Sequence, residues 1–334
     1  MRSALFSSLL TVAVAATAAA PAAAQAKYTI ETGSVAPEGT PWAEWLVGVK
    51  KRIEKDSAGD IKLKMFLASR RGGEKEMVEE LKKGRLQLFG GSVGAVASKY
   101  APELNVFELP FLFESDAEAD FVLNEVRADV SALLAKRGFT FVMWSENGWH
   151  GYGTKNKCVK TPADMKGLKM RSQESMIHAE TYKSYGASPE EMPVPEVLHS
   201  LQTGVVDGFS NTPLFSQAVS WHTGIKHYAY TKHIYQPALI IASKKWFDTL
   251  PANIQKIVGS NKEEKSGIDG VRSLTPLLLE NFKASGIEVC TPSAAERKAF
   301  ADASRAVWDK FKNQSAGNKK IFNAVMAAKK KFKK

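Results

Sequence analysis

Strand-like and helix-like segments alternate along this chain, and no other feature of the sequence constrains the fold as strongly. Residues 27–35 alternate like a strand, residues 61–68 read as a second strand and residues 86–89 as a third. Helix-like segments at 41–59 and 73–84 separate them. A β-α-β-α-β order of this kind predicts a mostly parallel sheet with helices on both faces.

Local signals mark where several helices begin. Thr40 and Pro41 have the residue types preferred at an N-cap and at the first helical position. Ser115 with Glu118 forms a capping-box pattern for a long helix through Leu134, and Ser293 with Glu296 caps a last long helix. The sequence therefore predicts helices that start at 41, 116 and 294.

A second block of short strands and helices starts near Asn147 and leads to a long apolar strand at 235–243. Residues 244–285 then read as a nearly continuous helix, broken at Pro251 and near Gly267. No linker separates the blocks, which suggests two domains joined by several crossings, as in hinge proteins. We expect domain I at 27–146 plus 236–275 and domain II at 147–235 plus 276–334.

The N-terminal 26 residues have the composition of a secretory signal peptide. Arg2 supplies a positive charge, residues 3–20 are apolar or small, and Ala24-Gln25-Ala26 is a cleavage pattern. The full chain carries a net charge of +11, much of it in the basic C-terminal tail, which we interpret as a solvated helix. Export argues against nucleic acid as a partner, and we expect a periplasmic monomer that attracts anions.

The two cysteines, Cys158 and Cys290, each lie beside a strand-like run. Export permits a disulfide, but the sequence leaves a bridge and two buried thiols equally open. His222, His227 and His233 are spaced by five and six residues, which fits no helical pair of metal ligands. We therefore expect no metal site.

Gly90-Gly91-Ser92-Val93-Gly94 matches the G-x-S-x-G pattern of a hydrolase nucleophile elbow. All six histidines follow Ser92, so chain order alone excludes nothing. No H-G-G-G-type oxyanion segment precedes the motif, and only three strands come before it. We favour a strand-to-helix turn whose glycines let the backbone approach a ligand, and keep a secreted serine hydrolase as the alternative.

Three spaced groups of residues resemble one known family. They are Asp164, Lys166, Gly167, Lys169 and Arg171; then Gly186, Ala187 and Pro189; then Glu196, Val197, Leu201, Gln202, Gly204, Val206, Asp207, Gly208 and Asn211. In this order they resemble the DctP-type extracytoplasmic solute-binding proteins of tripartite ATP-independent periplasmic (TRAP) transporters. The segments 72–88 and 108–113 look like the first domain of that family.

The resemblance implies an α/β clamp like that of periplasmic binding proteins. Each domain has a mixed sheet flanked by helices, and a long helix spans the hinge. Such a protein needs no cofactor, catalyses no reaction, closes on a small organic acid and delivers it to membrane permease subunits.

The resemblance also implies roles for individual residues. Arg171 matches the arginine that pairs with the ligand carboxylate, and Asn211 matches a residue that hydrogen-bonds the ligand. His150 stands where the family often has a second basic residue, which puts dicarboxylate and sialic-acid ligands in doubt.

Four aromatic residues fall where the family cleft is lined: Trp42, Trp149, Phe209 and Tyr235. Each of them fits a core position equally well. Ser92 and Arg70 complete the expected site. Aromatic pockets suit flat or apolar ligand bodies, so we expect a monocarboxylate with such a body. A protein of the same fold that binds a lipid acid is the second alternative.

Overall fold

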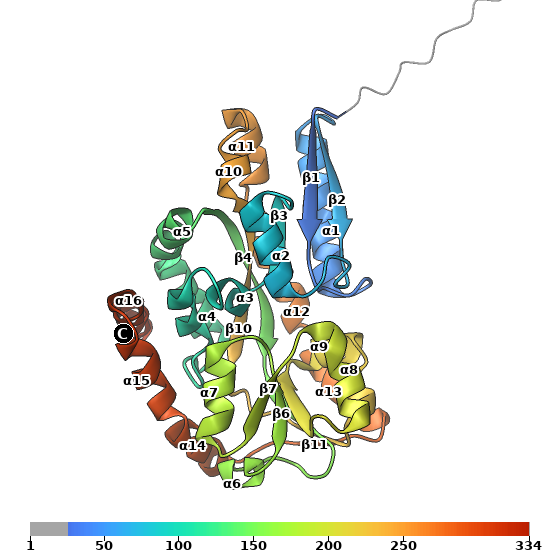
Figure 1. The fold of residues 1–334 in the computed structure, drawn as a ribbon, viewed down its shortest axis with the longest axis vertical. Helices are drawn as coiled ribbons and strands as arrows, with labels where there is room; N and C mark the ends of the chain where they lie inside the picture. The colour runs from blue at the N-terminus through green and yellow to red at the C-terminus, as the bar shows by residue number, and fades with distance from the viewer. Residues whose placement is uncertain (1–25, 334) are drawn as a thin grey trace, which may run out of the picture.

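The computed structural model describes residues 26–333, so the expected signal peptide lies, apart from Ala26, outside the described residues. Two separate mixed sheets form the framework (Figure 1). The first has the order β2-β1-β3-β10-β4 and the second β11-β9-β5-β8-β6-β7. None of the described helices is long and apolar enough to cross a membrane.

The first sheet contains β1 (Tyr28–Gly33), β2 (Ile61–Phe66), β3 (Leu88–Ser92), β4 (Phe139–Trp149) and β10 (Tyr235–Ser243). β1 pairs in parallel with β2 and β3, whereas β10 runs antiparallel between β3 and β4. Around it lie α1 (Pro41–Asp56), α2 (Glu74–Lys83), α3 (Val93–Ala97), η1 (Pro102–Glu108), α4 (Asp116–Glu125), α5 (Arg127–Lys136), α10 (Lys244–Phe247) and α11 (Ala252–Val258). The parallel β-α-β-α-β start predicted from the sequence is confirmed.

The second sheet contains β5 (Gly151–Thr154), β6 (Lys169–Ser172), β7 (Ser188–Glu191), β8 (Gly208–Asn211), β9 (His227–Ala229) and β11 (Glu288–Cys290). β5 is antiparallel to β8 and β9, and the other pairs are parallel. Its helices are α6 (Pro162–Met165), α7 (Met176–Ser184), α8 (Val194–Thr203), α9 (Pro213–Ala218) and η2 (Trp221–Gly224).

Local capping signals explain where several helices begin. The Thr40 and Ser293 side chains accept hydrogen bonds from the main-chain N–H of Ala43 and Glu296, as the sequence predicts. Ser115 caps α4 in the same way, but the Glu118 carboxylate accepts from the N–H of Glu114. The long helix expected after Ser115 is two helices, because the chain leaves helical geometry at 126.

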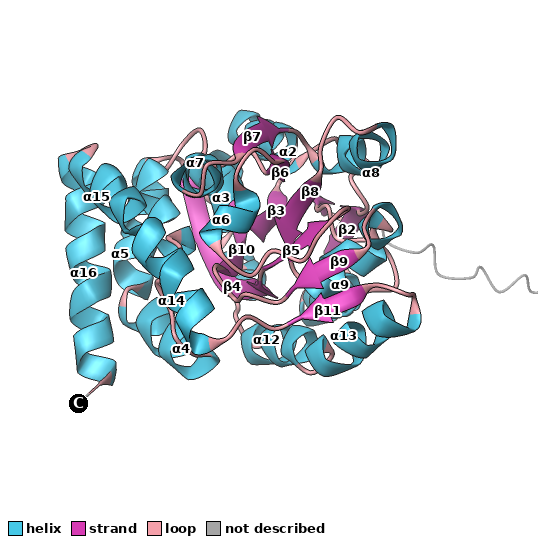
Figure 2. Ribbon diagram, turned by 90° about the horizontal axis from the view of Figure 1, so that it is seen from below, coloured by secondary structure: helices cyan, strands magenta, loops and turns pink. Residues whose placement is uncertain are grey.

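The C-terminal segment is also divided, into α14 (Ala294–Ala303), α15 (Arg305–Asn313) and α16 (Ala316–Phe332). α14 packs on α6 and α15 on α7, beside the second sheet, whereas α16 packs against α4 and η1 beside the first. Seen from below, these helices run along one side of the molecule (Figure 2). The tail therefore contacts both halves of the fold.

Three segments cross between the sheets. β4 leads into β5 through His150, and residues 230–234 join β9 to β10. α12 (Glu264–Arg272) and α13 (Thr275–Ala284) are joined by two residues that keep right-handed helical angles. Since α12 packs on α1 and β4 while α13 packs on α9 and β11, they form the expected helix that spans the hinge. Pro276 has no N–H to donate to the carbonyl of Arg272, which explains the interruption at 273–274.

One expected helix break is wrong. Gly267 lies inside α12, where an added Cβ would come within 2.5 Å of the Trp45 indole. This glycine therefore allows α12 to approach α1 closely. The interruptions lie instead at 248–251, which includes the expected break at Pro251, and at 259–263.

Cys158 and Cys290 form a disulfide, with 6.4 Å between their Cα atoms. It ties the loop after β5 to the edge strand β11 and closes a loop of 132 residues. The choice that the sequence left open is settled in favour of the bridge.

Replacing both cysteines by serine is expected to lower the free energy of unfolding by about 2–5 kcal/mol, because the unfolded chain gains conformational freedom. Urea denaturation of the oxidised protein and of the double variant measures the difference. Reduced wild-type protein is the control and should match the variant. Equal stability of all three samples would contradict the prediction.

Candidate functional site

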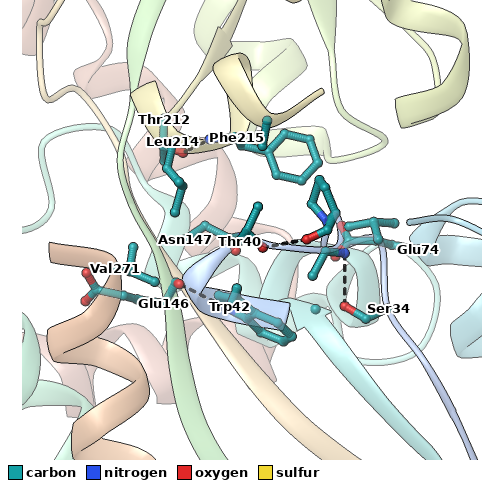
Figure 3. A pocket seen from close by; sticks show the side chains of 15 residues that line it. Ser34, Thr40, Trp42, Glu74, Glu146, Asn147, Thr212, Leu214, Phe215 and Val271 are labelled. Carbon is teal, nitrogen blue, oxygen red and sulfur yellow. Dashed lines mark hydrogen bonds between the residues drawn. The ribbon is translucent and has the colours of Figure 1, made fainter. Parts of the chain in front are cut away.

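A pocket opens between the two sheets, where several strands and helices end (Figure 3). About 430 Å³ inside it, including space open to solvent, is free of protein atoms. Its lining comes from the loop after β1, the start of α1 and α2, the ends of β3, β4, β8 and α12, and from α9 (Pro213–Ala218). The lining residues are Ser34, Val35, Ala36, Pro37, Thr40, Trp42, Glu74, Gly91, Glu146, Asn147, Thr212, Leu214, Phe215, Ala218 and Val271.

Most of this lining is apolar, and Trp42 is its largest side chain. The Trp42 indole N–H donates to the main-chain carbonyl of Glu146 at 3.1 Å, which fixes the ring in the pocket wall (Figure 3). Leu214 and Phe215, from the start of α9, belong to the opposite wall. The pocket therefore offers an apolar surface between the two sheets, and we name it the apolar pocket.

Arg171 lies in a second pocket, which shares Glu74 with the first. The arginine is on β6 and only 3% exposed. Its Nε and Nη2 donate to the main-chain carbonyl of Met192, at 3.2 and 3.0 Å. The guanidinium carbon stands 5.0 Å from the ring centre of Trp221, a cation–π contact.

Arg171 stays charged at neutral pH. Burial lowers the pKa of Arg171 to about 10, and the nearby Tyr182 and Glu74 oppose that shift. None of its hydrogen bonds to described residues uses Nη1. We name this place the arginine pocket. It presents a positively charged side chain that is held in place and whose Nη1 group, which no described residue uses, is free to donate hydrogen bonds to a ligand.

Ser92 and Glu74 form the facing wall of the arginine pocket. Glu74 is the first residue of α2, and Ser92 ends β3. The Ser92 N–H donates to Glu74 Oε1 at 2.7 Å, and its hydroxyl donates to Oε2 at 2.6 Å. Desolvation raises the pKa of Glu74, against the two hydrogen bonds from Ser92. Ser92 also caps α3 by accepting from the N–H of Ala95.

Sequence reasoning did not find Glu74, Trp221, Leu214 or Phe215. Only Glu74 has a local signal, since it follows Gly72-Gly73 at a helix start, where a carboxylate is favoured. Gly91 is required beside it, because an added Cβ would come within 2.4 Å of Glu74 Oε1. The other three are placed only by tertiary packing.

His150 is completely buried where β4 passes into β5. Its Nδ1 lies 2.9 Å from the Ser210 hydroxyl and its Nε2 lies 3.2 Å from Gln236 Oε1. Desolvation, and then the nearby His178, hold the pKa of His150 well below its usual value. The ring is therefore neutral at neutral pH, and both of its nitrogens are hydrogen-bonded within the protein. His150 does not supply the second positive charge that the family often has at this position.

Three other predicted site residues lie around the two pockets at different depths, and a fourth, Arg70, lines neither of them. Asn211 ends β8 and is buried; its Oδ1 accepts from the N–H of Thr212, a pocket residue, and no hydrogen bond to described residues uses Nδ2. Phe209 is buried and packs against Trp221, behind Arg171. Trp149 lines an adjoining pocket. Arg70 is 61% exposed and pairs with Glu38, so the structure does not bring it to the cleft.

Tyr235, the ninth predicted residue, belongs to a buried cluster at the hinge. Its hydroxyl donates to Glu146 Oε2 at 2.6 Å, and the same oxygen accepts from Arg272 Nε and Nη2 at 2.8 and 2.6 Å. Glu146 lies in β4 three residues before its end, Tyr235 starts β10 and Arg272 ends α12. Arg272 also binds Asp120 of α4. Each of the three crossings therefore contributes one member of this hinge cluster.

The three histidines considered as metal ligands in the sequence contact different residues in the structure. His222 contacts the Ser216 carbonyl, His227 contacts Glu288, and His233 contacts Ser210 and Thr231. Among the described residues, one group of potential metal ligands lies close together: Cys158, Glu288 and Cys290. Its two sulfurs are joined in the disulfide, so they are not available as thiolate ligands.

The structure has a cleft between two sheets, three hinge crossings and a buried arginine near a strand end. This is the architecture that the resemblance around Arg171 and Asn211 implies. Residues 32–314 match the sequence model of the family described as "Bacterial extracellular solute-binding protein, family 7", the DctP family. The chain belongs to this family. The resemblance to TRAP solute-binding proteins and the expected clamp fold are thereby confirmed.

Relatives of this family-7 protein come from several bacteria. A solute-binding protein of Verminephrobacter eiseniae is 34% identical over 207 residues, and the matched part is 62% of either chain. The 2,3-diketo-L-gulonate-binding periplasmic protein YiaO of Escherichia coli K12 is 30% identical over 254 residues, 75% of this chain and 76% of YiaO. A TRAP periplasmic solute-binding protein from Bordetella, with its ligand assigned as pantoate, is 28% identical with a TM-score of 0.81, over 89% of this chain and 98% of that one.

Proposed function

We propose that this family-7 protein captures a small monocarboxylic acid in the cleft between its sheets. The observation that carries the proposal is the buried Arg171, held by the Met192 carbonyl and by Trp221. A guanidinium is the side chain best suited to bind a carboxylate with two parallel hydrogen bonds. In our proposal Arg171 binds the carboxylate through Nη1 and its remaining donors, and Asn211 Nδ2 and Ser92 orient the acid.

The apolar pocket supports an acid with an apolar body. Trp42, Leu214 and Phe215 would contact that body, while the carboxylate points toward Arg171. Two relatives bind acids with a single carboxylate, 2,3-diketo-L-gulonate and pantoate, by their descriptions. Pantoate carries a branched apolar carbon, so it illustrates the class that we propose.

The proposal includes export, hinge closure and transfer. Ligand contacts from both sheets would favour the closed clamp, since a ligand shifts a conformational equilibrium by its differential affinity. The domains would be the two expected from the sequence. The closed protein would deliver the acid in the periplasm to the membrane subunits of a TRAP transporter, and no reaction would take place in the cleft.

A thermal-melting panel on ligand-free residues 27–334 tests the function. It compares C4-dicarboxylates, sugar acids, aromatic acids, branched 2-oxo and 2-hydroxy acids, and fatty acids. Ligand at a hundred times its Kd stabilises the protein by about 2.7 kcal/mol, which moves Tm by several degrees. We expect a shift with monocarboxylates. A shift with fatty acids alone would favour the lipid-acid alternative, and no shift with any acid would contradict the proposal.

Ser92 is expected not to react as a hydrolase nucleophile. Its hydroxyl donates to Glu74 and accepts from Ala95, and no histidine of the described chain bonds it. In a Ser-His-Asp hydrolase a histidine hydrogen-bonded to the serine hydroxyl accepts its proton, whereas the Ser92 hydroxyl is bonded to the Glu74 carboxylate. Treatment with a fluorophosphonate probe, followed by mass spectrometry, should give equal background labelling of wild-type protein and Ser92→Ala. Stoichiometric labelling that is lost in Ser92→Ala would establish the hydrolase.

A further inference from the structure

Glu74 is shared by the apolar pocket and the arginine pocket. It lies at the start of α2 on the side of the first sheet, whereas Arg171 lies on the second sheet. A ligand held between the sheets with its carboxylate on Arg171 would therefore have Glu74 beside it. The hydrogen bonds and charge of the Glu74 carboxylate therefore limit which other functional groups the ligand can have.

The carboxylate of Glu74 has hydrogen-bond donors but no salt-bridge partner. The N–H and hydroxyl of Ser92 each bind one of its oxygens. Among the described residues no lysine, arginine or histidine nitrogen lies within 4.0 Å, and the adjacent Lys75 pairs with Glu174 at 3.2 Å instead. An ionised carboxylate accepts about four hydrogen bonds, so roughly half of its capacity remains free.

A negatively charged group in this position has opposite effects on two kinds of ligand. A hydroxyl or ammonium group of the ligand would use the free acceptor positions of Glu74. A second carboxylate would meet like charge in a partly desolvated cleft, where repulsion is stronger than in water. Burial already raises the pKa of Glu74, so the site resists further negative charge.

We propose that Glu74 determines specificity by accepting a hydrogen bond from a hydroxyl or ammonium group of the bound acid and by rejecting a second carboxylate. The inference rests on the proposed function, because it assumes an acid on Arg171. It assigns to the site a ligand class defined by one carboxylate, one nearby donor and an apolar body.

Four acids that differ only at C2 separate the possibilities. All share a carboxylate and an isopropyl group: 2-hydroxy-3-methylbutanoate, valine, 2-oxo-3-methylbutanoate and 2-isopropylmalonate. Calorimetry with mature wild-type protein should give at least tenfold tighter binding for the hydroxy acid or for valine than for the oxo acid and the malonate. Which of the two binds tighter distinguishes a hydroxyl from an ammonium partner.

Glu74→Gln removes the charge and keeps the shape, and the Ser92 hydroxyl can rotate to accept from the new amide. We expect the preference for the donor-bearing acid to fall below threefold and the affinity for 2-isopropylmalonate to rise. The melting temperature of the ligand-free variant checks its fold, and Glu79→Gln on the same helix is the matched control, with an unchanged preference.

The possible outcomes distinguish failure of the proposed role of Glu74 from failure of the proposed acid-binding function. Equal binding of all four acids, lost in Arg171→Ala, would overturn the role of Glu74 and leave the proposed function standing. A preference that persists in Glu74→Gln would also overturn it. Binding of none of the four, together with no response to any acid in the melting panel, would overturn both.

Discussion

Replacing Arg171 by alanine is expected to lower the affinity for the bound acid at least about 30-fold. Truncating one partner of a buried, hydrogen-bonded charge pair costs ~2–5 kcal/mol of binding free energy. Arg171 is 3% exposed and already oriented by the Met192 carbonyl and Trp221, so the ligand carboxylate would lose a preorganised partner. Isothermal titration calorimetry with the tightest acid of the melting panel measures the loss.

Two further variants make this test specific. Arg171→Lys keeps the charge but not the planar fork, so affinity should still fall at least about tenfold. Arg85→Ala removes an exposed arginine that pairs with Glu80 outside the cleft, and affinity should not change. The melting temperature of each ligand-free variant separates weak binding from misfolding. Unchanged affinity in Arg171→Ala would exclude this residue from the site.

The second large effect is expected at the hinge. Arg272→Ala leaves Glu146, which is 1% exposed, without its cation, and breaking a buried ion pair in this way costs about 3–5 kcal/mol. Urea denaturation measures the free energy of unfolding. Lys265→Ala is the matched control on the same helix, because Lys265 is 85% exposed and its pair with Asp269 contributes little. Equal losses in the two variants would contradict the role of the hinge cluster.

The loss in Arg272→Ala should also depend on pH. Desolvation raises the pKa of Glu146 from its ordinary 4.5 to about 7, although hydrogen bonds from Arg272 and Tyr235 favour the ionised form. Without Arg272 the folded-state pKa rises further. Because the pKa of Glu146 is higher in the folded than in the unfolded protein, proton binding to Glu146 stabilises the folded state. This stabilisation is complete below pH 4.5 and is lost as pH rises through the folded-state pKa. Wild type and variant lose this contribution alike up to about pH 7, and only the variant continues to lose it above that pH, so the difference from wild type should grow as pH rises above about 7.

Local chemistry made several parts of this fold predictable from the sequence. The helix starts after Thr40 and Ser293 depend on capping contacts three residues away, and the strand at 235–243 depends on a continuous apolar run. Arg171 could be singled out because its surrounding motif resembles a known family. Its place between Met192 and Trp221 could not, because those contacts join residues 21 and 50 positions apart.

The missed features depend on distant segments. Glu74 and Ser92 are 18 residues apart and meet only because α2 and β3 pack together, and Glu146 and Arg272 are separated by 126 residues. His150 was expected as a ligand partner from its place in a motif. Its neutral, internally bonded state follows from burial, which the motif does not encode. Arg70 likewise follows β2 as expected but turns toward Glu38.

The most direct measurement is the crystal structure of residues 27–334 with the tightest acid of the panel bound. We expect the ligand carboxylate within hydrogen-bond distance of the Arg171 guanidinium, and the apolar body against Trp42 and Phe215. A carboxylate held elsewhere, with Arg171 still bonded only to the Met192 carbonyl, would contradict the proposed mode of capture.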